Sequence, residues 1–209
     1  MKIFYAVLTV IYVGWFVWYG GSGEAITNAE LESYITSMKE KSPSGPERIA
    51  ETTELMHRLA AFDTGNEYLM INLIKYRDKA VYPADSVWAD ETDARAADGR
   101  YTQGVIKELF IRGGLPVLKS NVIGTFMLDE DWRDWDEVSI VRYRSVKDML
   151  DMILGMADSG LAVHKFASIE QTHVFPAEPV ISLFSIRLLL ALLLFVLAVL
   201  VRAVVSKVG

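Results

Sequence analysis

The chain has 209 residues, of which 52% are hydrophobic, and it contains no cysteine. Its 27 acidic residues outnumber its 21 lysines and arginines, so the formal net charge is −6. The lack of cysteine excludes disulfide bonds, thiolate catalysis and cysteine-ligated metals. The acidic balance argues against nucleic acid as a partner, because nucleic-acid binding requires a basic surface.

Residues 1–20 are predicted to form a transmembrane helix. The uncharged run IFYAVLTVIYVGWFVWY has 17 residues, which as a helix span about 25 Å, the short end of a bilayer crossing. It ends in Trp15, Trp18 and Tyr19, and such aromatics are enriched where a membrane meets water. A cleaved signal peptide is the alternative, with Lys2 as its basic start and GGSGEA as its cleavage region. The length of the run and its aromatic end favour a retained anchor.

A second transmembrane helix is predicted at residues 180–205. The apolar run that follows Arg187 is uninterrupted, and one arginine near a helix end does not prevent a span, because its long side chain can reach the headgroups. The basic residues at the outer ends of the two spans are Lys2, Arg202 and Lys207. By the positive-inside rule both termini are then cytoplasmic and the acidic middle of the chain is periplasmic. We therefore expect a two-pass protein of a bacterial-type inner membrane, in contact with the lipid bilayer.

Residues 24–64 are predicted to form a helical lead-in to the main domain. In the segment TNAELESYITSMKEK, Thr27 and Glu30 have the spacing of a capping box at a helix start. The segment SPSG ends this helix, and Pro46 suits the first turn of a second helix that runs to about Ala61. Two helices are therefore expected before the main domain.

Residues 66–178 are predicted to form an α+β domain. Alternating apolar residues and turn signals give the order β-α-β-β-α-β, the split ferredoxin-like arrangement, in which helices cover one face of an antiparallel sheet. The polar stretch 83–99 is expected to be an exposed loop, and Gly124 is expected to mark a bulge or a close approach in the second strand. The expected strands are 68–76, 117–128, 137–143 and 172–175, and the expected helices are 101–111, one that begins after Ser145, and 160–169.

Four segments of this domain resemble a known superfamily. They are YLMINLIKYRDKAVYP, DGRYTQG at the entry to a helix, WDEVSIVRYRSVKDMLDMI and the late HKFASIEQTHVF. In these segments the chain is similar to the dimeric α+β barrel superfamily, and within it to the uncharacterised family called domain of unknown function 1330. The resemblance covers residues 66–176 and implies a ferredoxin-like domain that pairs through its sheet. The superfamily includes small-molecule monooxygenases, haem-degrading enzymes, isomerases and chlorite dismutase-like proteins, so the fold does not fix the function.

The first strand carries an amide as a candidate binding group. Alternation places Met70, Asn72, Ile74 and Tyr76 on one face, and we expect this Asn72 face to make a sheet-to-sheet contact, most simply with a second copy of the chain. The amide of Asn72 either orients a carbonyl or enol of a small molecule, or bonds only to neighbouring backbone or a buried water. Both interpretations stay open at the level of the sequence.

Other residues complete the candidate site. His164 matches the late histidine of the family and is the candidate acid or base, because imidazole titrates near neutrality; a structural helix histidine is the alternative. Arg142 is a candidate for anion binding, although an arginine at a strand edge more often pairs with a carboxylate. The candidate binding residues are Asn72, Tyr76, Tyr101, Tyr143 and Arg142.

No metal site and no cofactor are predicted. The three histidines, His57, His164 and His173, lack the spacing of a metal site. A haem with His164 or His173 as its axial ligand is the alternative.

Two functions from different classes follow. In the first, the chain is a membrane-anchored, extracytoplasmic binding or accessory subunit of a larger membrane complex and uses its ferredoxin-like domain for dimerisation or docking. In the second, it is a small-molecule enzyme, of the oxygenase or isomerase kind, with a pocket around Asn72 and His164. Two anchors are more than an enzyme with a soluble substrate needs, and this favours the subunit.

Overall fold

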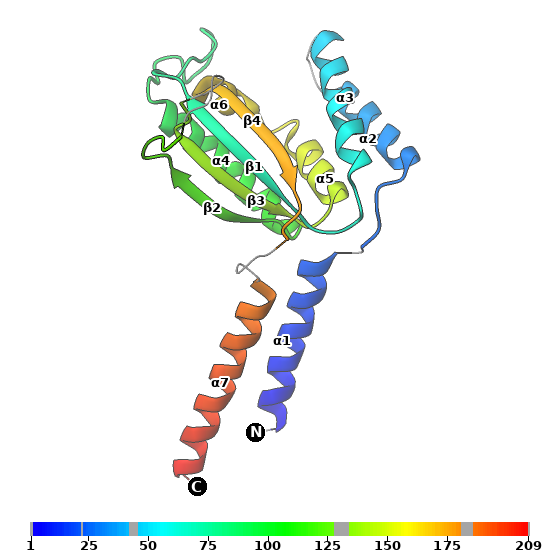
Figure 1. Ribbon diagram of the computed structural model, residues 1–209, viewed down its shortest axis with the longest axis vertical. Coiled ribbons are helices and arrows are strands. Elements are labelled where there is room, and N and C mark those ends of the chain that lie inside the picture. Colours follow the sequence, from blue (N-terminus) through cyan, green and yellow to red (C-terminus); the bar gives the residue numbers. More distant parts are fainter. Residues whose placement is uncertain (1, 22, 42–45, 128–133, 181–185, 209) are drawn as a thin grey trace. The chain divides into compact units, whose positions relative to one another are not determined.

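The computed structural model describes residues 2–21, 23–41, 46–127, 134–180 and 186–208. These residues form seven helices and a sheet of four antiparallel strands, which confirms the α+β fold class (Figure 1). The chain divides into two compact units, one made of Met1–Gly21 with Pro179–Gly209 and the other of Ser22–Glu178. The first unit holds the two terminal helices, and the second holds the sheet.

The first unit consists of two apolar helices, α1 (Lys2–Gly20) and α7 (Ile186–Val208). Both are long and apolar enough to cross a membrane, α7 over Leu188–Ser206. Little of either helix is buried inside the protein, unlike the core helix of a soluble domain. Near the end of α1 the rings of Trp15 and Trp18 lie 4.9 Å apart, an aromatic group of the kind found at membrane surfaces. Both helices are therefore consistent with a membrane protein, while the sidedness of the termini stays a prediction.

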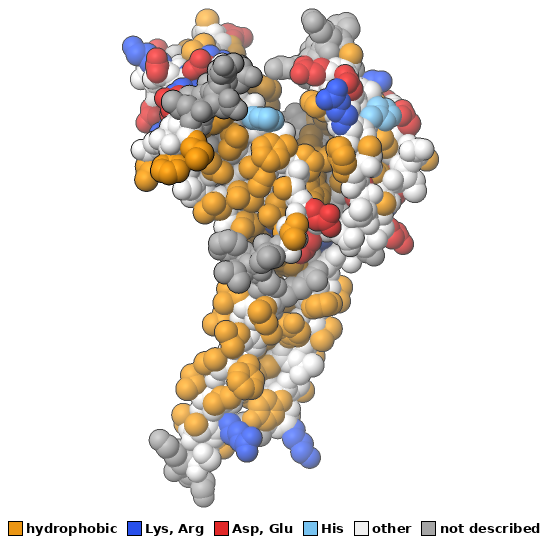
Figure 2. All heavy atoms as spheres, viewed as in Figure 1, with side chains coloured by type: hydrophobic (Ala, Val, Ile, Leu, Met, Phe, Trp, Pro, Cys, Tyr) orange, Lys and Arg blue, Asp and Glu red, His pale blue; other side chains and the backbone are white. Residues whose placement is uncertain are grey.

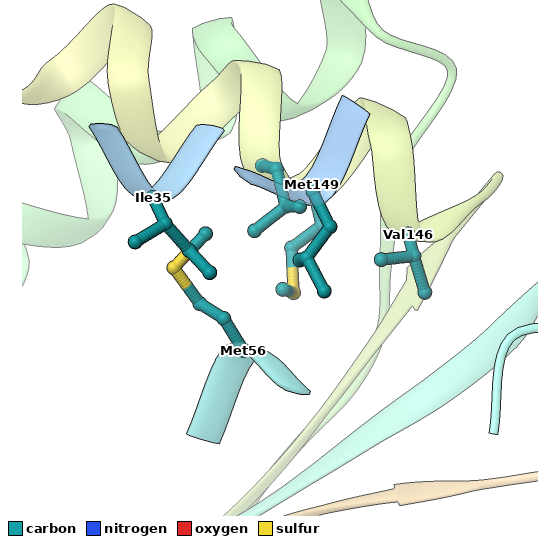
Figure 3. Close-up of a cluster of buried hydrophobic side chains, with 6 residues drawn as sticks. Ile35, Met56, Val146 and Met149 are labelled. Carbon is teal, nitrogen blue, oxygen red and sulfur yellow. The ribbon is translucent and has the colours of Figure 1, made fainter. Parts of the chain in front are cut away.

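The two lead-in helices are α2 (Asn28–Lys41) and α3 (Pro46–Ala61), with bounds close to those predicted. The capping box is present, because the N–H of Thr27 donates to Glu30 Oε2 (2.8 Å) and the N–H of Glu30 donates to Thr27 Oγ1 (3.3 Å). α2 contacts both α3 and α5 (Val146–Met156). The side chains buried between these three helices form the apolar cluster (Figure 3), which consists of Leu31, Ile35, Met56, Val146, Met149 and Leu150.

The sheet of the second unit has the strand order β2-β3-β1-β4, so β1 is central and β2 and β4 are the edges. Along the chain its elements follow the predicted β-α-β-β-α-β order, including the short helix expected before the last strand. The helices lie behind the strands in the view of Figure 1. The strands are β1 (Tyr68–Tyr76), β2 (Leu115–Asn121), β3 (Glu137–Tyr143) and β4 (Ile169–Ala177), and the helices beside them are α4 (Ala94–Ile111), α5 and α6 (Ala162–Ser168).

The helices cover the Asn72 face of the sheet, so the prediction that this face makes a sheet-to-sheet contact is wrong. Tyr68 and Met70 pack against the apolar cluster, and Tyr76 packs against Ala94 of α4. Asn72 shares this side because side chains alternate along a strand. The sequence shows that both sides of β1 are apolar, but it does not show which side the chain's own helices cover.

The opposite side of the sheet, here called the open face, has no helix in front of it in Figure 1. Figure 2 shows hydrophobic side chains gathered over the strands on this side. In the register of the sheet, Ile71 of β1 lies opposite Ile140 of β3 and Phe175 of β4. Phe175 is 38% exposed and Leu118 of β2 is 41% exposed. The large apolar residues of the open face are Leu69, Ile71, Leu73, Leu118, Val138, Ile140 and Phe175.

The polar stretch predicted as a loop is partly helical. α4 begins at Ala94 and not near Tyr101, because Asp93 caps the helix by accepting hydrogen bonds from the N–H groups of Arg95 (2.8 Å) and Ala96 (3.1 Å). The first two turns of α4 therefore lie within the expected loop, and they carry charged residues of the candidate site.

The second strand is shorter than predicted. β2 ends at Asn121, and Ile123 and Phe126 beyond it are almost fully exposed. Gly124 lies outside the sheet with open space around it, so it is neither a bulge nor a close approach. The register of β2 shifts near Pro116 instead. Position 128, the predicted end of this strand, lies outside the described residues, and β4 is longer than its predicted span.

Candidate functional site

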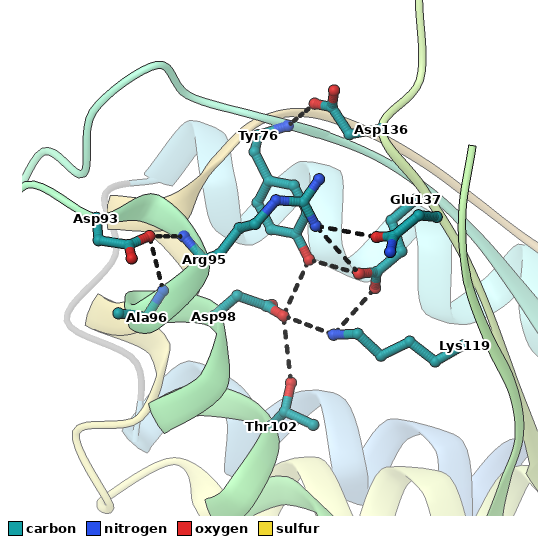
Figure 4. A network of polar contacts seen from close by, with 10 residues as sticks. Tyr76, Asp93, Arg95, Ala96, Asp98, Thr102, Lys119, Asp136 and Glu137 are labelled. Carbon is teal, nitrogen blue, oxygen red and sulfur yellow. Dashed lines mark hydrogen bonds and ion pairs between the residues drawn. The ribbon is translucent and has the colours of Figure 1, made fainter. Parts of the chain in front are cut away.

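Polar groups enclosed between α4 and the sheet form the best candidate site. β1 provides Tyr76, α4 provides Asp98, β2 provides Lys119 and β3 provides Glu137, and Figure 4 shows their polar ends turned toward one another. We call these four residues the acid cluster. Asp98 is only 5% exposed and Glu137 only 1%. Buried carboxylates are costly unless charges and hydrogen bonds compensate them, and such groups are common at functional sites.

One hydroxyl lies between the two carboxylates. Tyr76 Oη is 3.0 Å from Asp98 Oδ2 and 3.0 Å from Glu137 Oε2. A phenol has a single proton to donate, so it cannot satisfy both acceptors at once. Lys119 Nζ donates a hydrogen bond to Asp98 Oδ2 (3.0 Å) and forms an ion pair with Glu137 Oε1 (3.1 Å). The hydroxyl and the ammonium therefore hold the two carboxylates side by side.

A second cation completes the charge balance of the acid cluster. The guanidinium carbon of Arg95 lies 4.6 Å from the centre of the Tyr76 ring, and Arg95 Nη1 lies 3.9 Å from Glu137 Oε2. The side chains of Arg95 and Lys119 are about half exposed, whereas both carboxylates are buried. Two half-exposed cations thus lie beside two buried anions. A ligand that displaces either cation meets two carboxylates and a hydroxyl, which suits a cationic or hydrogen-bond-donating group.

The environment fixes the charge states of two members of the acid cluster. Burial raises the pKa of Tyr76, and the charges of Asp98 and Glu137 raise it further, so the phenol stays a neutral hydrogen-bond donor. Burial opposes the charge of Lys119, but its contacts with Asp98 and Glu137 outweigh this effect and raise its pKa. The arrangement therefore combines a neutral donor with a firmly charged ammonium.

His164, the predicted acid or base, lies in a different polar group. It is 9% exposed, its Nδ1 is 2.7 Å from the hydroxyl of Tyr82, and its ring meets the ring of Trp88 edge to face at 5.6 Å. The guanidinium of Arg100 lies over the same Trp88 ring, 4.2 Å from its centre. Burial, and then the charge of Arg100, lower the pKa of His164. The imidazole is therefore neutral at physiological pH.

The side chain of Asn72 bonds to its own sheet. Its Nδ2 donates to the carbonyl oxygens of Met70 and Ser139, both at 3.1 Å. These contacts favour the interpretation that Asn72 is a satisfied core amide. The structure does not join Asn72 to His164 through a hydrogen bond or ring contact of the described residues.

The remaining predicted residues fall into separate surroundings. Tyr101 lies three residues after Asp98 on the same face of α4, and burial, then the charge of Asp98, raise its pKa. Tyr143 stacks on the ring of Tyr68 at 5.6 Å, against the apolar cluster. Arg142 is buried, donates to the carbonyl of Gly113 (2.6 Å) and forms an ion pair with a glutamate at the start of β1, so its contacts are those of a structural residue.

Sequence reasoning missed most of the charged groups of the site. Asp98 lies four residues after Ala94 and three before Tyr101, so all three share one face of α4. This spacing in the sequence indicates that the Asp98 carboxylate lies on the side of α4 that faces the sheet. Lys165 was missed as well: its Nζ is 5.6 Å from the centre of the Tyr101 ring, and burial lowers its pKa.

In the described part of the chain, no three histidine, aspartate or glutamate side chains gather as a metal site.

Comparisons with known proteins reveal a related fold. No protein-family profile and no curated protein matches the chain. The chain resembles the crystal structure of RPA0582, a protein of unknown function from Rhodopseudomonas palustris, with 25% identity and a TM-score of 0.54, over 62% of this chain and 94% of that one. Methylated RPA0582 gives 24% identity and a TM-score of 0.54, over 61% and 91% of the two chains. RPA0582 is thus matched over nearly its whole length, and the likeness supports the fold without supplying a function.

Proposed function

We propose that the chain is a membrane-anchored binding or accessory subunit whose sheet domain pairs with a second copy through the open face. The observation that carries the proposal is the set of large apolar side chains on that face. A monomer that exposed such a patch in water would tend to aggregate. Pairing about a two-fold axis buries the same patch on both copies.

Three further features support the pairing. The Asn72 face is already filled by the chain's own helices, so the open face is the side left for a partner. The two apolar terminal helices would hold copies in one membrane, which raises their effective concentration. The resemblance to the dimeric α+β barrel superfamily and to domain of unknown function 1330 adds a precedent for pairing through the sheet.

Ile71→Glu tests the pairing, because it places a charge at the centre of the open face. The full chain in mild detergent is examined by cross-linking and light scattering. We expect the parent to be a dimer and Ile71→Glu to be a folded monomer. Ile106→Glu is the matched control, since Ile106 is an exposed residue of α4, and it should leave the dimer intact. A parent that is already monomeric, or an Ile71→Glu variant as associated as the parent, contradicts the proposal.

The same preparation tests the role as an accessory subunit. A protein that co-purifies at a fixed ratio supports an accessory subunit of a larger membrane complex. Loss of that protein in Ile71→Glu would place the partner, and not a second copy, on the open face. Absence of any fixed-ratio protein from repeated preparations counts against the accessory role.

The proposed topology has both termini in the cytoplasm and the sheet domain in the periplasm. Its basis is the position of Lys2 at the start of α1 and of Arg202 near the end of α7. A reporter that is active only outside the cytoplasm should fail when fused after residue 209 and work when inserted beside Val87, a fully exposed residue of a turn. The reverse pattern would place the domain in the cytoplasm.

A second candidate function is that of a small-molecule enzyme, favoured by one observation: the Tyr76 hydroxyl lies within 3.0 Å of two buried carboxylates. Native mass spectrometry of the detergent-solubilised protein tests it. A bound small molecule that is lost in Asp98→Asn, but kept in Asp158→Asn at an exposed site, supports the enzyme. Retention of the molecule in both variants counts against the acid cluster as its site.

His164 allows a separate test of this second candidate. Because its folded pKa is depressed, the unfolded chain takes up a proton first, and stability falls as pH drops below about 6.5. If His164 is only a buried neutral residue, His164→Asn should remove that fall in a thermal melt and leave any bound molecule in place. Loss of the molecule with an unchanged melt would identify His164 as a ligand-binding residue.

A further inference from the structure

The second unit contains a cavity of about 470 Å³ at the opposite end of β1 from the acid cluster. A site for a small molecule typically measures about 300–1,000 Å³, so the cavity is of suitable size. It is lined by residues near the end of α3 and at the end of the edge strand β4. Tyr68, the first residue of β1, and Val146, the first residue of α5, also line it. Its apolar walls are formed by Leu59, Phe62, Val146, Phe175, Pro176 and Ala177.

Three of the residues that line the cavity are acidic. Asp63 accepts hydrogen bonds from the N–H groups of Ile26 (2.6 Å) and Gly65 (2.9 Å), and Glu67 is paired with a buried arginine. The third carboxylate belongs to Glu178, which is exposed and forms no hydrogen bond or ion pair with any described residue. The cavity therefore offers apolar walls and an exposed carboxylate that is available for a cation.

The covalent chain limits how far the cavity can lie from the two apolar helices. Glu178 precedes Leu188, the first residue of the second candidate span, by ten residues, which reach at most about 36 Å. Ile26, whose N–H donates to Asp63 of the cavity lining, follows the end of α1 by six residues, which reach at most about 22 Å. Both limits come from the covalent chain alone. These limits leave a molecule dissolved in the membrane as a candidate ligand of the cavity.

We propose that this cavity binds a lipophilic cation, that is, an apolar chain with an ammonium head, taken up from the bilayer. The chain would contact the rings of Phe62 and Phe175, and the ammonium would pair with Glu178. An anionic head of the same size would meet three carboxylates and be repelled. Of the large apolar residues of the open face, only Phe175 also lines the cavity, so the proposal can be tested separately from the pairing of two copies.

Photo-labelling of the full chain in phosphatidylcholine vesicles tests the proposal. The probes are dodecylamine, dodecanol and dodecanoic acid, each with a diazirine in its alkyl chain, and the labelled peptides are identified by mass spectrometry. We expect dodecylamine to label peptides that contain Phe62 and Phe175 several-fold more than the other two probes. Glu178→Gln should lower this labelling to the level of dodecanol. Glu170→Gln, an exposed residue of the same strand outside the cavity, should leave it unchanged.

Three results would overturn the proposal. Labelling confined to α1 and α7 would mean that the probes only dissolve in the membrane. Equal labelling of the cavity by all three probes would mean an apolar surface that does not recognise the head. If the Glu178→Gln variant were still labelled more by dodecylamine than by the other probes, another group would attract the cation. Ala177→Trp fills the cavity and should abolish cavity labelling by the amine while leaving labelling of the two spans intact.

Discussion

The two ends of the helix-covered side of the sheet are stabilised in opposite ways. At one end Tyr68 and Met70 rest on the apolar cluster, whose six buried side chains are all aliphatic or methionine. At the other end Tyr76 of the same strand lies in the acid cluster, where two buried carboxylates depend on one hydroxyl and two cations. Burial of apolar side chains accounts for the apolar end, because such burial stabilises a fold. The acid cluster contains buried charges, which a stable core does not require.

Loss of volume in the apolar cluster should have the largest effect. Leu150 is 2% exposed, so Leu150→Ala leaves a cavity and should lower the free energy of unfolding by about 2–5 kcal/mol. Thermal and denaturant unfolding of the detergent-solubilised chain measures the loss. Leu55→Ala, at an exposed site on α3, is the matched control and should change stability by less than about 0.5 kcal/mol. Equal losses in the two variants would show that the apolar cluster is not the core.

Removal of the bridging hydroxyl should have the next largest effect. Tyr76→Phe leaves two buried carboxylates with one donor fewer, and it should cost about 1–3 kcal/mol. The control is Tyr34→Phe, since the hydroxyl of Tyr34 donates to Asp151 in an exposed contact (2.7 Å) and should contribute at most about 1 kcal/mol. A Tyr76→Phe variant as stable as the parent would mean that the two carboxylates do not need this hydroxyl.

The cationic caps should give a smaller effect that depends on salt. Lys119 is half exposed, so Lys119→Met should cost about 1 kcal/mol at low ionic strength, and the difference should shrink as NaCl screens the charges. Leu150→Ala should show no such salt dependence. Unfolding of the parent and both variants in about 0.1 M and 1 M NaCl makes the comparison. If Lys119→Met and Leu150→Ala responded identically to salt, the two ends of the sheet would not differ in how they are stabilised.

The smallest expected effect is the loss of stability at acid pH that is due to Glu30 of α2. Hydrogen bonds from Lys147 and then from Thr27 lower the pKa of Glu30 from 4.5 to about 2. The unfolded chain therefore takes up this proton first, and the stabilisation, present above pH 4.5, is lost as pH falls toward 2. Circular dichroism melts should show that Glu30→Gln loses less stability than the parent over this range. Glu40→Gln on the same helix is the control, and it should follow the parent.

The sequence predicted the parts of the fold that local patterns determine. The bounds of β1 and β3 and the cap at Thr27 follow from alternation and from spacing within a few residues. The choice of the covered face of β1 was not predictable in this way, because both faces are apolar and the decision depends on how distant helices pack. The start of α4 was readable from Asp93 as a helix cap, but the polar composition of the stretch favoured a loop.

The candidate site was predicted only in part. Tyr76 and Tyr101 were named from the sequence, and they lie in or beside the acid cluster. Glu137 was read as the start of a strand and Asp98 as a loop residue, since nothing local shows that positions 39 residues apart meet over one hydroxyl. Asn72 and His164 were grouped into one pocket, yet the structure gives each its own partners.

The central position of β1 also determines the order in which the domain can fold. Thr172 of β4 donates to the carbonyl of Leu73, 99 residues earlier in the chain, and β3 reaches the same strand from 67 residues away. During synthesis β1 therefore emerges long before either of its neighbours and waits without partners. Pairing over such distances is slow, and unpaired apolar strands attract other chains. Misassociation is thus most favoured in the interval between the synthesis of β1 and the synthesis of the last strand. A chaperone that shields β1 would be of most use in that interval.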